Sequence, residues 1–133
     1  MRIVLDTNVL VSGVFFTGPP FKILEAWRNG KVEIVMSKEI FQEYQRVGEI
    51  LSEEFSGVDI APFLSLLLVK SKFYDPPELK EPVCDDPSDD KFLACALAAR
   101  CKLIISGDKH LLRVTGYRGI EVLRPREFLD GRL

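Results

Sequence analysis

The chain has 133 residues, 47% of them hydrophobic, and a formal net charge of −2. A chain of this length fits one compact domain, residues 1–133, which buries about two-thirds of its unfolded surface and needs no disulfide or metal in order to fold. No apolar run approaches the ~20 residues of a membrane-spanning helix, and the net charge excludes nucleic-acid binding by bulk positive charge, though not by a local basic patch or a bound cation.

Two features of the sequence bear on its cellular compartment. The N-terminal segment MRIVLDTN has only three apolar residues before an acid, so it lacks the apolar region of a secretory signal peptide. Cys84, Cys95 and Cys101 are odd in number and form no C-x-x-C pair, which favours reduced thiols packed as small hydrophobic side chains. We therefore expect a cytoplasmic protein.

Short apolar runs rich in Val and Ile predict strands at residues 3–5, 32–36, 103–105 and 120–123. Because these runs are almost continuously apolar, both faces of each strand should be buried, as in a parallel sheet. Helical patterns lie between the strands, at residues 21–28, after an N-cap at Ser37, over the almost wholly apolar residues 58–69, and from near Ser88. This alternation predicts an α/β fold, a three-layer α/β/α sandwich with a central, mainly parallel sheet of about five strands.

Acidic residues follow two of the predicted strands at the point where each strand ends. Asp6 comes directly after the first strand, and Asp108 follows the strand at 103–105. Ligands of open parallel sheets bind in the crevice at the carboxyl ends of the strands. The sequence therefore predicts two carboxylates at one edge of the sheet.

A further acid is expected from the segment VCDDPSDDKFLACALA, residues 83–98. If Ser88 caps the helix, Asp90 lies on the same stripe as Leu93 and Leu97 and faces the sheet edge, whereas Asp89 points about 100° away. The alternative is that Asp90 is an ordinary acid in a first helical turn, where the helix dipole favours negative charge.

Glu43 lies at the border of the buried face of the helix after Ser37, so it too can lean toward this edge, although a partly exposed helix glutamate is an equal alternative. Four carboxylates about 4–6 Å apart repel by ~1 kcal/mol per pair in water, and by more inside a protein. Either some of them keep their protons, or a cation binds among them. An all-oxygen set of ligands favours Mg²⁺ or Mn²⁺ over Zn²⁺.

Four segments in this order and spacing resemble the PIN-domain ribonucleases, in particular the toxin components of prokaryotic toxin–antitoxin pairs. They are VLDTNVLVSG, SKEIFQEYQRV, DDPSDDKFLACALAARC and LIISGDKHLL, and the resemblance extends over essentially the whole chain. The resemblance implies the PIN-like version of the predicted fold. It also implies an endoribonuclease that uses Mg²⁺ or Mn²⁺ to hydrolyse phosphodiester bonds of single-stranded RNA.

The resemblance also implies roles for particular residues. The positions that match the catalytic acids of the family are Asp6, Glu43, Asp90 and Asp108. Asp6, Asp90 and Asp108 would bind the metal directly or through water, and Glu43 would bind it or accept a proton from the attacking water. Asn8 and Ser106 match small polar residues that orient the acids. Asp85, Asp86 and Asp89 resemble an acid-rich version of the motif, which makes Asp89 the main rival of Asp90.

Local cations near these acids would contact the RNA phosphates. The candidates are Arg46, Lys91, Lys109 and His110, together with Arg113, and the alternative for each is a solvated helix face or a salt bridge. The resemblance further implies a homodimer and a small antitoxin partner. Two other functions stay open. One is a non-cleaving PIN-like module that binds RNA or protein, and the other is an aspartyl-phosphate receiver or phosphohydrolase. The sequence Asp6-Thr7-Asn8 argues against the phosphohydrolase, because such hydrolases carry D-x-D, whereas a receiver is usually marked by an adjacent pair of acids after an early strand.

Overall fold

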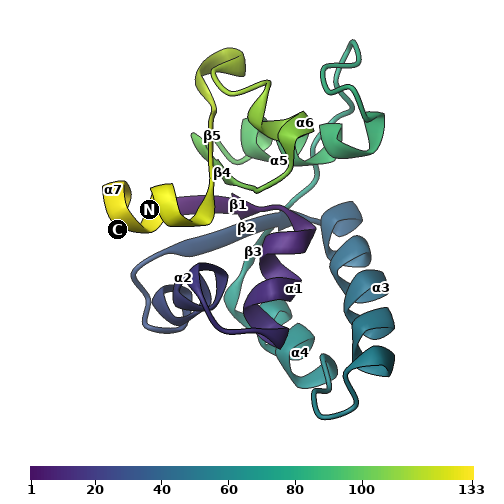
Figure 1. Cartoon of the computed structure of the whole chain (residues 1–133). Coiled ribbons are helices and arrows are strands. Elements are labelled where there is room, and N and C mark those ends of the chain that lie inside the picture. The colour runs from purple at the N-terminus through teal and green to yellow at the C-terminus, as the bar shows by residue number, and fades with distance from the viewer.

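Five short parallel strands form the central layer, and the computed structural model describes all 133 residues around them. The strand order is β3-β2-β1-β4-β5 (Figure 1). The strands are β1 (Arg2–Leu5), β2 (Glu33–Ser37), β3 (Lys72–Tyr74), β4 (Leu103–Ile105) and β5 (Glu121–Leu123). Every neighbouring pair is parallel, which confirms the predicted α/β sandwich and its sheet.

Helices cover both faces of this sheet. They are α1 (Thr7–Phe15), α2 (Pro19–Arg28), α3 (Lys38–Glu54), α4 (Ala61–Lys70), α5 (Asp90–Ala98), α6 (Lys109–Leu112) and α7 (Pro125–Arg132). Helices α1 to α4 lie on one side of the sheet and α5 and α6 on the other, while α7 packs against α2 (Figure 1). Helix α5 packs on β1, β2 and β4, so its first turn reaches the carboxyl ends of the central strands.

Local sequence explains where the best-predicted elements begin. The Ser37 hydroxyl accepts a hydrogen bond from the Ile40 N–H at 3.2 Å, so Ser37 is the N-cap of α3 as expected. Pro19 and Pro20 open α2, where their missing N–H groups cost nothing. The observed β2 begins and ends one residue later than the predicted strand.

Three elements differ from the prediction. Helix α1 follows β1 where no helix was predicted, and the edge strand β3 was not expected, because its three residues are neither Val- nor Ile-rich and are largely exposed. Helix α4 is not buried almost all round, since Val69 is 83% exposed and Leu68 is 54% exposed. An apolar pattern alone does not distinguish a buried helix from one with an uncovered face.

Taken singly, none of the helices has the length and apolar character to cross a membrane, and only the sharply bent pair of α1 and α2 meets that criterion.

Gly13 allows α1 and α2 to approach closely. A Cβ atom at this position would lie 2.6 Å from Leu24 Cδ1 and 2.9 Å from the Pro20 carbonyl oxygen, and the latter belongs to the backbone of α2. We expect Gly13→Ala to lower the free energy of unfolding by about 1–3 kcal/mol through overpacking, measured by urea denaturation. Gly131→Ala in α7 is the control, because a Cβ there meets no atom within 4 Å, and equal stability of the two variants would contradict the prediction.

Candidate active site

Asp6 and Asp108 meet at the carboxyl ends of β1 and β4, as predicted. The Asp6 N–H donates to the Ile105 carbonyl oxygen at 3.0 Å, which joins the two strand ends. The Ser106 hydroxyl donates to Asp6 Oδ2 at 2.7 Å and accepts from the Asp108 N–H at 2.9 Å. Ser106 is fully buried, so this one hydroxyl fixes the positions of both acids. That geometry supports the orienting role expected for it.

Burial raises the pKa of Asp6 above its ordinary value. The hydrogen bond from Ser106 opposes this effect, and the neighbouring charge of Asp108 adds to it. Asp6 is only 5% exposed. A buried carboxylate of this kind binds a proton or a cation more readily than one in water.

Asp89 is the third acid of the site. It is 8% exposed, and its Oδ2 atom is buried with no hydrogen-bond partner. Burial and, after it, the charges of Asp108, Asp6 and Asp86 together raise the pKa of Asp89 to about 6, and the charge of Lys91 opposes them. Almost all buried polar atoms in proteins have a partner, so this oxygen is a candidate to bind a proton or a cation.

The expectation that Asp90 faces the sheet edge is wrong. Its Oδ1 accepts a hydrogen bond from the Cys84 N–H at 2.8 Å and its Oδ2 accepts one from the Val83 N–H at 3.2 Å. Both oxygens of Asp90 therefore secure the loop before α5. This carboxylate therefore has a structural task.

The packing of α5 explains why Asp89, and not Asp90, is the acid beside Asp6 and Asp108. Asp89 lies on one stripe with Phe92 and Ala96, which are 0% exposed. The Asp90 stripe is buried too at Leu93, which is 0% exposed, and only its last residue, Leu97, is half-buried. The Asp90 side of the helix faces the loop 77–83, with which it forms a pocket. Because α5 is covered on both sides, its apolar stripe at 90, 93 and 97 did not identify the sheet-facing side.

The start of this segment also differs from the expectation. Ser88 is not the N-cap. A 3₁₀ turn over Pro87–Asp89 precedes α5, and Asp86 caps it by accepting hydrogen bonds from the Ser88 N–H at 3.0 Å and the Ser88 hydroxyl at 2.8 Å. The extra turn places Asp89 at the junction with α5, beside the strand ends.

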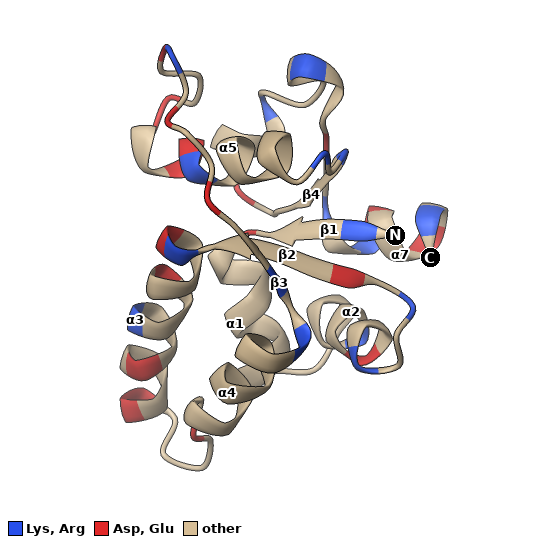
Figure 2. Cartoon of the chain, turned by 180° about the vertical axis from the view of Figure 1, so that it is seen from behind, with Lys and Arg blue, Asp and Glu red and all other residues tan.

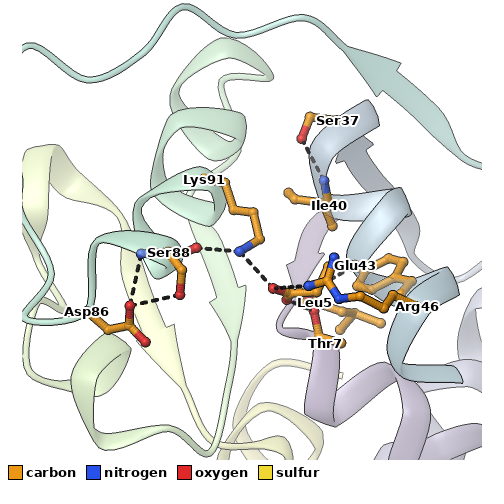
Figure 3. A network of polar contacts seen from close by, with 10 residues as sticks. Leu5, Thr7, Ser37, Ile40, Glu43, Arg46, Asp86, Ser88 and Lys91 are labelled. Atoms are coloured by element: carbon orange, nitrogen blue, oxygen red, sulfur yellow. Dashed lines mark hydrogen bonds and ion pairs between the residues drawn. The ribbon is translucent and has the colours of Figure 1, made fainter. Parts of the chain in front are cut away.

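Glu43 reaches the same edge from α3, but both of its oxygens already have partners. Lys91 Nζ lies 2.9 Å from Glu43 Oε1 and Arg46 lies 3.7 Å from the same oxygen. The Thr7 hydroxyl donates to Glu43 Oε2. Figure 3 shows Lys91 reaching from α5 across to Glu43 on α3, beside Thr7 at the start of α1. Glu43 thus lies at the site as an ion-paired carboxylate.

Below this ion pair, α3 is anchored to the first strand. The Tyr44 hydroxyl is fully buried and donates to the Leu5 carbonyl oxygen at 2.5 Å, and burial raises the pKa of Tyr44 well above its ordinary value. Sequence analysis missed this contact, the bond from Thr7 to Glu43 and the Lys91–Glu43 pair. The position of Thr7 directly after Asp6 was the only sequence feature that pointed to any of these three contacts.

The remaining predicted residues lie around this edge with different exposure. Charged residues occupy both segments that border it, the start of α5 and the first turns of α3 (Figure 2). Arg46 and Lys109 are exposed. Asn8 is exposed in a hollow shared with Asp108 and makes no side-chain hydrogen bond, so it does not orient the acids in the way that was expected. His110 Nδ1 lies 3.8 Å from Asp85 Oδ2, which also accepts a hydrogen bond from Arg113 at 3.0 Å.

The four acids do not form the tight cluster that the sequence suggested. No group of three His, Cys, Asp or Glu side chains has converged into a complete metal site. The Lys91 ammonium offsets the repulsion at Glu43, and the charges of neighbouring acids contribute to the raised pKa values of Asp6 and Asp89. The all-oxygen donors and the orphaned Asp89 Oδ2 nevertheless fit a hard divalent cation.

A parallel sheet with buried acids at the carboxyl ends of its central strands places the chain in a class of α/β domains with an acidic site at the sheet edge. A family model described as PIN domain matches residues 2–110. The chain belongs to the PIN-domain family, whose members are generally nucleases and usually use divalent metals. No curated protein matches the chain.

Proposed function

We propose that the chain is a metal-dependent endoribonuclease that hydrolyses phosphodiester bonds of single-stranded RNA. One observation carries this proposal. Asp89 lies near Asp6 and Asp108, and its buried Oδ2 atom has no hydrogen-bond partner. Burying a carboxylate costs free energy because the charge loses its hydration, and a bound proton or cation compensates this cost. The family match supports the nuclease class.

Asp6, Asp89 and Asp108 would hold the ion, in place of the set with Asp90. Mg²⁺ or Mn²⁺ bound there would supply a Lewis acid for the scissile phosphate and lower the pKa of a water molecule. Ser106 holds Asp6 and Asp108 next to each other through its two hydrogen bonds. Because Asp6 is anchored to the end of β4 as well, Asp6 and Asp108 are held next to each other before any ion binds.

The RNA strand would approach across the open side of this edge. Arg46, Lys109 and His110 would contact its phosphates, since Arg46 and Lys109 are exposed and His110 is half-buried. Lys91 is omitted from this set because its side chain is only 7% exposed and is engaged with Glu43. Asn8 borders the same hollow as Asp108 and would contact the RNA there.

We further propose that the protein is a cytoplasmic homodimer that acts as the toxin of a toxin–antitoxin pair, held inactive by a small antitoxin. Support for this part comes from the resemblance of VLDTNVLVSG and DDPSDDKFLACALAARC to such toxins. The genomic neighbourhood tests it. We expect a short upstream reading frame that encodes a DNA-binding protein, and its absence would contradict the toxin role.

Cleavage of a labelled single-stranded RNA tests the enzymatic proposal. We expect cleavage with Mg²⁺ or Mn²⁺, none with EDTA, and a rate at least ~100-fold lower for Asp6→Asn, because a pre-positioned acid is lost. Asp130→Asn, an exposed acid in α7, is the matched control and should cleave normally. Cleavage that persists in EDTA, or in Asp6→Asn, would reject this site.

A second candidate is a PIN-like module that binds RNA without cutting it. Two observations favour it, the absence of a converged group of three metal-binding side chains and the ion-paired state of Glu43. The same assay separates the candidates if binding is measured beside cleavage. RNA binding by the wild type with no cleavage in either metal would favour the module.

A further inference from the structure

Lys91 is the only basic residue that is buried in the structure. Its side chain is 7% exposed and lies over the Phe92 ring, with Nζ 5.0 Å from the ring centroid. Its ammonium group donates to the Ser88 carbonyl oxygen and lies 2.9 Å from Glu43 Oε1. A lysine is rarely buried unless it is paired, so its position beside the acids is specific.

The acids at this edge fall into two groups with different partners. Glu43 has Lys91 and Arg46 at one oxygen and the Thr7 hydroxyl at the other. By contrast, Asp89 Oδ2 has no partner at all. One part of the site therefore already has a cation of the chain in contact with its carboxylate. Asp6 and Asp108 accept hydrogen bonds from Ser106 and from the His110 N–H, but neither they nor Asp89 form an ion pair.

We infer that this site takes a single divalent ion, held by Asp6, Asp89 and Asp108, and that the Lys91 ammonium provides at Glu43 the positive charge that a second ion would otherwise provide. The inference rests on the proposed metal-dependent nuclease function. Two-metal sites hold their ions about 3.5–4 Å apart and need a shared set of free carboxylate oxygens. The partners of Glu43 take its oxygens out of such a set. Lys91 is then a positioning residue that holds Glu43, and not a contact for RNA.

Binding of Mn²⁺ to the full chain, followed by calorimetry and by electron paramagnetic resonance of free Mn²⁺, tests this inference without RNA. The wild type should bind one Mn²⁺ per chain. Lys91→Met removes the charge but keeps the length of the side chain, and should bind a second Mn²⁺ per chain. Lys91→Arg should stay at one. Lys22→Met, an exposed lysine in α2, is the matched control and should also stay at one.

Two acid variants separate failure of the inference from failure of the proposed function. Asp6→Asn should weaken Mn²⁺ binding at least about tenfold, whereas Glu43→Gln should change it by less than about threefold, because Glu43 is not a ligand. Three outcomes would overturn the role of Lys91 and leave the proposed function standing. They are two ions bound by the wild type, one ion bound by Lys91→Met, and equal weakening by Glu43→Gln and Asp6→Asn. No Mn²⁺ binding by the wild type would overturn the proposed metal-dependent function. Circular dichroism checks folding, and if Lys91→Met is unfolded the Glu43→Gln titration decides.

Discussion

Replacing Asp89 with asparagine should lower the rate of RNA cleavage about 1,000-fold, whereas Asp90→Asn should lower it by less than about tenfold. Asp89 has a buried carboxylate oxygen without a partner and lies near enough to Asp6 and Asp108 for their charges to raise its pKa, so its charge is available for a cation. The charge of Asp90 is used by the N–H groups of Val83 and Cys84. The measurement is single-turnover cleavage of a labelled single-stranded RNA in Mg²⁺.

The two variants should also differ in stability. Asn in place of Asp90 weakens two hydrogen bonds to the loop and should lower the free energy of unfolding by about 1–2 kcal/mol, measured by urea denaturation. Equal cleavage rates for the two variants, or a larger loss for Asp90→Asn, would contradict the assignment of Asp89 to the site and restore the arrangement first predicted from the sequence.

In the absence of metal, Asp89→Asn should make the protein more stable at pH 7.5 by about 1–3 kcal/mol, because one pKa unit corresponds to 1.36 kcal/mol. The pKa of Asp89 is raised to about 6 in the folded chain from 3.8. The folded state therefore holds this proton more tightly than the unfolded state. The resulting stabilisation is complete below pH 3.8 and is lost as the pH rises through about 6. Asn carries no such charge and avoids the loss.

The comparison is made by urea denaturation in EDTA at pH 4.0 and pH 7.5. Near pH 4.0 the wild type and Asp89→Asn should be almost equally stable, and the difference should appear by pH 7.5. The charged groups that act on Asp89 are Asp108, Asp6, Asp86 and Lys91, and all remain in the variant. Asp130→Asn should show no such pH-dependent difference. A variant that is less stable than the wild type at pH 7.5 would contradict the prediction, and excess Mg²⁺ should stabilise only the wild type.

Sequence patterns correctly predicted the parts of the site that depend on strand ends. Asp6 and Asp108 each follow a short apolar strand, and the ends of parallel strands meet at one edge. The N-cap at Ser37 could be predicted equally well, because a serine before an amphipathic run makes its capping hydrogen bond to a residue only three positions away. Local chemistry and the period of the apolar pattern were sufficient in these cases.

By itself, then, the sequence determined the parallel α/β fold, the family and two of the acids at the sheet edge. Only the tertiary structure decided that Asp89 rather than Asp90 faces those acids, and that Lys91 is paired with Glu43. The physical reason is that α5 is covered by the sheet on one side and by the loop before it on the other. A helix with two apolar sides does not reveal from its own residues which side faces the strands, and an ion pair between two distant helices depends on how those helices pack.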